Sequence, residues 1–240
     1  MLKRIHVEGL VGILALLLAA CGAQRIRQTP PQIAGESAPA ASSASAATIY
    51  RIDANQSELR VLVYRGGPLA RFGHNHVMVN RAISGSLTFA EEASASAFQL
   101  SVPAAAFIVD DAQARREEGP DFAGEIPDDA KSGTLRNMLS TALLDADEFP
   151  AMTVKSVAAS GTLDASGGGA LIATVAISIA GHESTIDVPF TLASGPDCLS
   201  ASGSLELRQS ALGLTPFSLM LGALQVQDAL TIKFQIVANR

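Results

Sequence analysis

The sequence is short of basic residues. It has 17 lysines and arginines against 23 aspartates and glutamates, a formal net charge of −6 at pH 7, and no cluster of basic residues. Proteins that bind nucleic acid present a basic patch or stripe to the phosphate backbone. The charge balance therefore argues against nucleic acid as a partner.

Cysteine is scarce, with two residues, Cys21 and Cys198. Cys21 directly follows an N-terminal targeting segment and is expected to be acylated. This leaves Cys198 without a partner inside the chain, so the fold cannot depend on a disulfide. A reactive thiol needs a basic or histidine neighbour, and Asp197 beside Cys198 has the opposite charge. We interpret Cys198 as a strand-edge residue and not as a nucleophile.

The motifs of common enzyme classes are also missing. The chain has no Gly-Xaa-Ser-Xaa-Gly elbow, no glycine loop of the kind that holds phosphate and no pairing of cysteine with histidine. Paired carboxylates occur at 117–118 and 128–129, but they fall in a charged loop where water screens their repulsion. We therefore expect a protein that is not an enzyme and has no catalytic residue.

The apolar run near the N-terminus is short. Residues 10–20 follow Lys3 and Arg4 and are too few to cross a bilayer, for which a helix needs about 20. A charged start before such a run is typical of a signal peptide. The end of the run, Leu18-Ala19-Ala20-Cys21, resembles the lipobox of bacterial lipoproteins, in which the cysteine is acylated and becomes the new N-terminus. Residues 1–20 are thus predicted to be a lipoprotein signal peptide and Cys21 the lipidation site.

The residues after the lipobox indicate where the protein resides. Position 22 is glycine and not aspartate, which by the sorting rule of Gram-negative lipoproteins favours the outer membrane. We expect a lipid-anchored protein of the bacterial cell envelope, on the periplasmic face of that membrane. Residues 21–47 are rich in alanine, serine and proline and have too little apolar bulk to offset the entropy of ordering, which predicts a disordered tether. Residues 48–240 then form one domain.

Alternating apolar and polar residues recur through this domain, a pattern typical of strands with one buried and one exposed face. The alternation is clearest over residues 171–179, 186–192 and 230–236. Many short strands separated by turns predict a mainly β fold, an antiparallel sandwich or a barrel, and a barrel removes the edge strands. The predicted strands are 50–53, 57–65, 73–80, 83–89, 97–102, 151–158, 171–180, 184–193, 199–209 and 224–237.

Residues 128–145 break the β pattern. Leu135, Met138, Leu139, Ala142 and Leu143 recur at helical spacing and predict one short helix, which in a barrel commonly covers an open end. The preceding residues, 110–128, are dense in charge, and we interpret them as a solvated loop. The alternative is a role for one of its two arginines, at 115 and 116, at the rim of a ligand site.

Histidine is rare too, and three of the four histidines, His74, His76 and His182, lie in or beside two Gly-His pairs. If residues 73–80 are extended, His74 and His76 project from one face and are near enough to chelate one ion or hydrogen-bond one ligand. The plainer interpretation is a polar strand start whose imidazoles are solvated or bonded to nearby backbone. If the fold brings His182 to them, three nitrogens could bind zinc or copper, with Glu183 as an oxygen ligand.

Several of these segments together resemble the YceI-like domain family. They are residues 50–53 with Ser57, the strand at 83–89, the turn at 144–150 with the strand after it, and the hairpin centred on Gly181. The resemblance covers residues 48–240. It implies a periplasmic lipocalin-like barrel with a long apolar tunnel that holds an isoprenoid tail, such as that of a quinone or a polyprenyl carrier. The Gly-His pairs depart from the usual family pattern.

The inward strand faces predict which residues would line such a tunnel. Alanine and glycine on those faces, at Ala173, Ala201, Gly203 and Gly85, favour a hollow barrel, because a solid core would place bulk there. The predicted cavity residues are Leu87, Phe89, Val175, Ile177, Val188, Phe190, Leu205, Ile232 and Phe234.

Three functions compete on this basis. The first, which the sequence favours, is a non-enzymatic envelope lipoprotein that binds an apolar isoprenoid-type lipid in its barrel, because a wall of aliphatic and aromatic side chains stabilises a hydrocarbon tail by about 25 cal/mol per Å² buried. The second is a periplasmic lipoprotein that binds zinc or copper through His74, His76 and His182. The third is a structural envelope protein whose barrel is packed solid. The sequence leaves the oligomeric state open.

Overall fold

The computed structural model describes residues 48–240. The predicted signal peptide, the lipidation site Cys21 and the predicted tether lie outside the described residues. No helix in the part of the chain that is described has the length and apolar character to cross a membrane.

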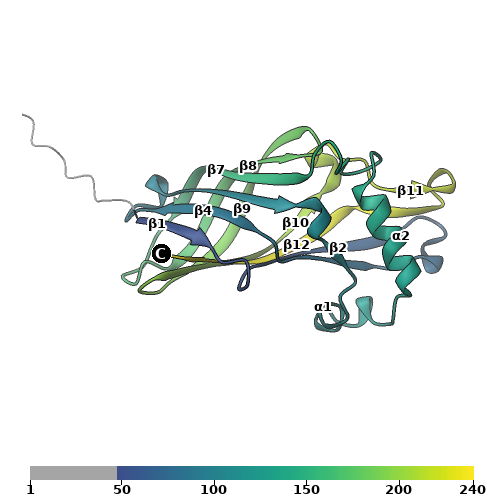
Figure 1. Cartoon of the computed structure of the whole chain (residues 1–240), viewed down its shortest axis with the longest axis horizontal. Coiled ribbons are helices and arrows are strands. Elements are labelled where there is room, and N and C mark those ends of the chain that lie inside the picture. The colour runs from purple at the N-terminus through teal and green to yellow at the C-terminus, as the bar shows by residue number, and fades with distance from the viewer. Residues whose placement is uncertain (1–47) are drawn as a thin grey trace, which may run out of the picture. The chain divides into compact units, whose positions relative to one another are not determined.

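Eight antiparallel strands form a closed barrel, and the pairing of β1 with β12 closes it (Figure 1). Around the barrel the order is β1, β4, β5, β7, β8, β9, β10 and β12. This confirms the predicted mainly β, antiparallel lipocalin-like barrel. The strand bounds are β1 (Thr48–Ile52), β4 (Ser84–Phe89), β5 (Ala97–Pro103), β7 (Ala151–Gly161), β8 (Gly169–Ile179), β9 (His182–Ser194), β10 (Cys198–Arg208) and β12 (Leu224–Asn239).

One side of the barrel is prolonged beyond its closed part. The end of β12 pairs with β1, whereas the preceding part pairs with β2 (Glu58–Gly66). β2 pairs with β3 (His76–Asn80), β3 with the short β6 (Ile108–Val109), and β11 (Ser218–Leu219) with the start of β12. Since β12 is 16 residues long, it serves both the barrel and this extension.

Two α-helices pack on the described strands. The predicted helix is present as α2 (Asp128–Leu139), but it ends before the predicted boundary because Ser140 takes extended dihedral angles. The second helix, α1 (Ala112–Glu117), lies where we predicted a solvated loop, so that prediction is wrong. The carboxylate of Asp111 accepts hydrogen bonds from the backbone N–H groups of Gln113 and Ala114 and thereby caps α1.

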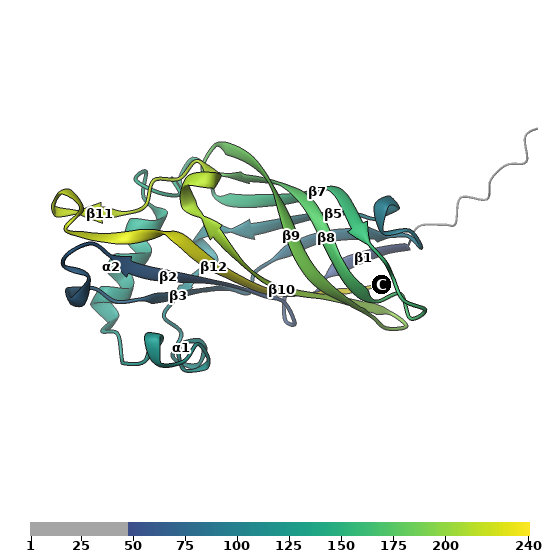
Figure 2. The ribbon, with the colours of Figure 1, turned by 180° about the vertical axis from the view of Figure 1, so that it is seen from behind.

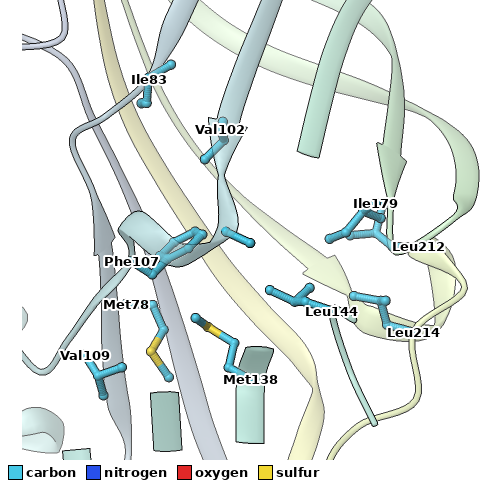
Figure 3. Packing of buried hydrophobic residues seen from close by; sticks show 11 residues of the cluster. Met78, Ile83, Val102, Phe107, Val109, Met138, Leu144, Ile179, Leu212 and Leu214 are labelled. Carbon is cyan, nitrogen blue, oxygen red and sulfur yellow. The ribbon is translucent and has the colours of Figure 1, made fainter. Parts of the chain in front are cut away.

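Apolar side chains fill both ends of the barrel. At one end, Met138 of α2 packs among Phe107, Met78 and Leu144, which closes that end (Figure 3). At the other end, a second cluster includes Tyr50, Leu171 and Leu199. A third cluster covers the outer face of β2 and β3, where Val77 and Val79 pack against Ala114 and Phe122. The barrel interior between the first two clusters is the place for a site.

Candidate functional site

A cavity of about 230 Å³ lies inside the barrel and is bordered by both end clusters. All eight barrel strands contribute side chains to its wall. The barrel is therefore hollow in part. The third predicted function, a structural protein, requires a barrel packed solid by its own side chains, and the cavity does not fit it. The volume of this cavity lies slightly below the range of about 300–1,000 Å³ that is typical of pockets for drug-sized ligands. The cavity therefore suits a narrow ligand.

The structure places every one of the nine predicted cavity residues on this wall. They are Leu87, Phe89, Val175, Ile177, Val188, Phe190, Leu205, Ile232 and Phe234. The sequence reasoning left out an inward row on β5, which consists of Phe98, Leu100 and Val102. The same two-residue alternation within the predicted strand 97–102 was the signal that could have found them.

The cavity wall offers almost nothing polar to a ligand. Ser96 and Ser156 are its only polar side chains among the described residues, and both hydroxyls already have backbone partners. The N–H of Ala90 donates to Ser96 Oγ at 3.0 Å, and the N–H of Phe98 donates to Ser156 Oγ at 2.8 Å. Because an unpaired polar group is costly to bury, the cavity selects hydrocarbon and excludes charged groups.

The small residues on the inward faces have two different uses. Ala173 and Ala201 line the cavity, as predicted. Gly203 does not leave space, because a methyl group there would lie 2.6 Å from Phe234 Cζ. At Gly85 a methyl group would lie 2.1 Å from the carbonyl oxygen of Gln99, and the φ angle is +145°. These two glycines permit close packing of a ring and of a strand, so it was wrong to interpret them as small residues that leave the barrel hollow.

The wall has a short ladder between β9 and β10, which diverge from their shared hairpin (Figure 2). Their ladder consists of four pairs, which join Leu199–Ser202 to Thr191–Ser194. At the far end of the gap, the 3-10 turn η5 (Gln209–Leu212) contacts β9, and Gly213 lies against the imidazole of His182. Between these points the wall consists of half-buried cavity residues: Ile186 and Val188 on β9, and Leu205 and Leu207 on β10.

The three predicted metal ligands do not come together. The rings of His74 and His76 do lie near each other, with centroids 6.3 Å apart. His182, however, packs against Gly213 at the start of β9. Among residues 48–240 no group of three or more histidine, cysteine, aspartate or glutamate side chains is close enough to hold a metal ion. The predicted zinc or copper site of His74, His76 and His182 is therefore not assembled in this structure.

His76 instead belongs to a buried polar cluster with Asp110 and Arg115. Its Nδ1 lies 2.6 Å from one carboxylate oxygen of Asp110. The other oxygen accepts hydrogen bonds from the N–H of Val77 and from the guanidinium of Arg115, at 2.9 and 2.6 Å. Burial alone would raise the pKa of the Asp110 carboxyl, but the hydrogen bonds from His76, Val77 and Arg115 outweigh it and lower that pKa.

Arg115 is 5% exposed, so neither the solvated loop nor a ligand rim describes it. Its guanidinium also donates to the carbonyl of Asn75 at 2.8 Å, which ties α1 to the start of β3. No local sequence pattern indicates this contact, because the partners of Arg115 are Asp110, just before α1, and Asn75, which is 40 residues earlier. We assign the cluster a structural role.

A second charged network lies on the outer face of β2 and β12. Arg60 pairs with Glu58, Glu117 and Glu118, and Lys233 also pairs with Glu118. The side chain of Glu118 is 4% exposed, so the interpretation of a water-screened carboxylate is wrong for Glu118, whereas Glu117 is 44% exposed. Burial would lower the pKa of Arg60, but its hydrogen bonds to these glutamates outweigh burial and raise it.

Comparison with known proteins identifies related folds. The model of the family described as the YceI-like domain matches residues 50–238. The crystal structure of BcnA from Burkholderia cenocepacia superposes with a TM-score of 0.56 at 20% identity and covers 78% of this chain and 99% of its own.

A polyisoprenoid binding domain from Saccharophagus degradans, implicated in plant cell wall breakdown, superposes with a TM-score of 0.53 at 12% identity. The match covers 79% of this chain and 97% of that domain. At these identities the two solved structures establish the fold alone. No curated protein matches the chain.

Proposed function

Since this chain belongs to the family of YceI-like domains, we propose that it is a non-enzymatic lipid-binding protein that holds an apolar, isoprenoid-type lipid inside its barrel. The narrower proposal is a quinone or a polyprenyl carrier. In both, the prenyl tail occupies the cavity and the polar head group stays outside it.

One observation carries this proposal: the cavity wall has two hydroxyl groups among its side chains, and backbone N–H groups already bond to both. A ligand there gains free energy from apolar contact alone, at about 25 cal/mol per Å² of surface removed from water. A branched, unsaturated hydrocarbon chain meets this requirement, whereas a sugar, a nucleotide or a peptide does not. The printed description of the Saccharophagus degradans domain, which names polyisoprenoid binding, supports the same class of ligand.

We further propose that the protein is a lipoprotein of the bacterial cell envelope, anchored through Cys21 at the periplasmic face of the outer membrane. The support for this part is the sequence Leu18-Ala19-Ala20-Cys21 and the glycine at position 22. Mass spectrometry of the purified protein tests it directly, because acylation adds the mass of its fatty chains to Cys21. An unmodified Cys21 in protein from bacterial membranes would contradict the anchor and leave the cavity proposal intact.

Native mass spectrometry of the unacylated chain, isolated from bacteria without added detergent, tests the lipid proposal. We expect an extra mass over the denatured protein that matches an isoprenoid lipid. A bare protein that takes up no added isoprenoid, such as a short-chain quinone, would overturn the proposal. A bare protein that instead bound one zinc ion would favour the metal-binding alternative.

A further inference from the structure

Four large apolar side chains project into solvent at one end of the domain. They are Phe72, Leu219, Met220 and Leu221, with exposed fractions of 65%, 48%, 72% and 109%. We call these four residues the apolar tip. The other exposed large apolar residues of the described chain are spread over four strands: Ile49 on β1, Ile108 on β6, Val157 on β7 and Ile172 on β8.

The apolar tip is one structural unit, although its residues come from two segments far apart in sequence. The N–H of Leu69, beside the turn η1 (Ala70–Phe72), donates to the carbonyl of Ala223 at 2.8 Å. Gly67 lies so close to the turn η6 (Met220–Gly222) that a methyl group there would be 2.6 Å from the carbonyl oxygen of Gly222. Both segments lie at the α2 end of the domain, away from β1 (Figures 1 and 2).

The backbone of the apolar tip is strained. Met220 and Leu221 have φ angles of +50° and +56°, in the left-handed region that costs a residue with a side chain about 1–2 kcal/mol. Neither side chain gains burial in return, because both are exposed. Strain that no internal packing offsets is typical of functional segments, and here it presents two apolar side chains outward.

The charges around the apolar tip select the kind of partner. Residues 66–75 and 217–224 contain no aspartate or glutamate, in a chain whose net charge is −6. The guanidinium of Arg71 lies 4.6 Å from the ring centre of Phe72, and Arg65 donates to the carbonyl of Gly73. A protruding apolar group with Arg65 and Arg71 beside it complements an anionic lipid surface, where the apolar side chains enter the acyl region and the arginines reach the phosphates.

We propose that the apolar tip inserts into the surface of an anionic lipid bilayer. The two loops form a protrusion and not a groove or a broad flat face, and so fit a deformable lipid surface better than a protein partner, for which about 800 Å² a side is usual. This interaction is independent of what the cavity binds. The barrel would contact the bilayer with the end that α2 closes.

A fluorescence experiment tests the proposal, because the chain contains no tryptophan. Met220→Trp places a single reporter in the apolar tip, and Val157→Trp places the matched reporter on the barrel wall. Each is made in the unacylated chain, residues 21–240 with Cys21→Ser, and mixed with vesicles of equal parts phosphatidylglycerol and phosphatidylethanolamine. We expect the emission of Met220→Trp to shift to the blue and that of Val157→Trp to stay unchanged.

Vesicle flotation measures the affinity. We expect the triple substitution of Leu219, Met220 and Leu221 by serine to weaken binding about tenfold or more, because even one fully buried leucine contributes more than that factor. The paired control, Val157→Ser with Ile172→Ser, should bind as the parent chain does. Because all of these residues are exposed, each variant should keep the parent circular dichroism spectrum.

Two results would overturn the proposal. One is equal binding of the parent and the triple-serine chain to anionic vesicles. The other is a self-associated parent chain in sedimentation velocity that becomes monomeric on the triple substitution and does not float with vesicles, which would make the apolar tip a contact between copies of the chain. Binding to anionic but not to pure phosphatidylcholine vesicles, weakened by Arg71→Glu, would support the role of charge.

Discussion

Nδ1 of His76 lies 2.6 Å from Oδ2 of Asp110, and the imidazole joins the start of β3 to a carboxylate with no exposed side-chain surface. The backbone of Asp110 has a φ angle of +56°, and its N–H donates to the carbonyl of Val77 at 2.8 Å. The pair fixes the segment before α1 against the outer face of β3.

We expect Asp110→Asn to destabilise the domain by about 3–5 kcal/mol, because the substitution leaves the buried guanidinium of Arg115 without its opposite charge. Urea unfolding followed by circular dichroism measures this free energy. Asp128→Asn is the matched control, since the Asp128 side chain is 97% exposed and surface changes stay within about 0.5 kcal/mol. Similar losses for the two variants would contradict the structural role of Asp110.

The lowered pKa of Asp110 predicts how stability depends on pH. The folded state stabilises the ionised form of the Asp110 carboxyl relative to the unfolded state, in which the pKa of an aspartate is about 3.9. This contribution is therefore complete above that value and is lost as the pH falls through the lower, folded pKa. We expect the unfolding free energy of the parent chain to fall more steeply below about pH 4 than that of Asp110→Asn. Parallel slopes in urea titrations at several pH values would contradict this.

A matched pair on β8 tests whether the cavity is the lipid site. Ala173 lines the cavity and is 2% exposed, whereas Ala170 on the same strand is exposed. We expect Ala173→Leu to fill part of the cavity and to weaken lipid binding about tenfold or more. Extra methylene groups in an occupied space cost about 1–3 kcal/mol, and about 1.4 kcal/mol corresponds to a tenfold loss of affinity. Ala170→Leu should bind as the parent does. Native mass spectrometry gives the bound fraction, and equal lipid binding by both variants would place the ligand elsewhere.

The surroundings of Gly203 and Gly133 predict opposite effects of a glycine-to-alanine substitution on stability. At Gly203 an added methyl group would lie 2.6 Å from Phe234 Cζ and 2.7 Å from the carbonyl oxygen of Pro189, whereas at Gly133 in α2 it would meet nothing within 4 Å. We expect Gly203→Ala to destabilise the domain by about 1–3 kcal/mol and Gly133→Ala to stabilise it by about 0.5–1 kcal/mol. Thermal unfolding measures both. Stabilisation by Gly203→Ala would show that the Phe234 ring can move aside.

The barrel strands could be predicted because the information that defines them is local. A residue of β8 faces the interior or the solvent according to a two-residue period, so Leu171, Ala173, Val175 and Ile179 were identified from the sequence and are buried. The same two-residue period predicts the residues of the cavity wall, because every barrel strand has one face toward the interior. The resemblance to the YceI-like family, which the family model confirms over residues 50–238, rested on turns and strand starts of the same local kind.

The features that could not be predicted depend on residues that are distant in sequence. Arg115 is buried because it packs against Asp110 and the start of β3. The charged run at residues 110–128 does not indicate that contact. His182 lies against Gly213, and its separation from His74 and His76 follows from where whole strands end. Gly85 and the inward small residues looked alike in the sequence, although the backbone of Gln99 occupies the space beside Gly85.

The short ladder between β9 and β10 has an energetic consequence for ligand exchange. Opening the wall between β8 and β9 would break a ladder of eleven residue pairs, whereas β9 and β10 are joined by four pairs near their hairpin. Along Ile186 and Val188 no pair of this ladder joins the two strands, and the side chains there line the cavity together with Leu205 and Leu207 of β10. For the apolar tail proposed above, we therefore expect entry sideways between β9 and β10, while α2 and the end clusters stay folded.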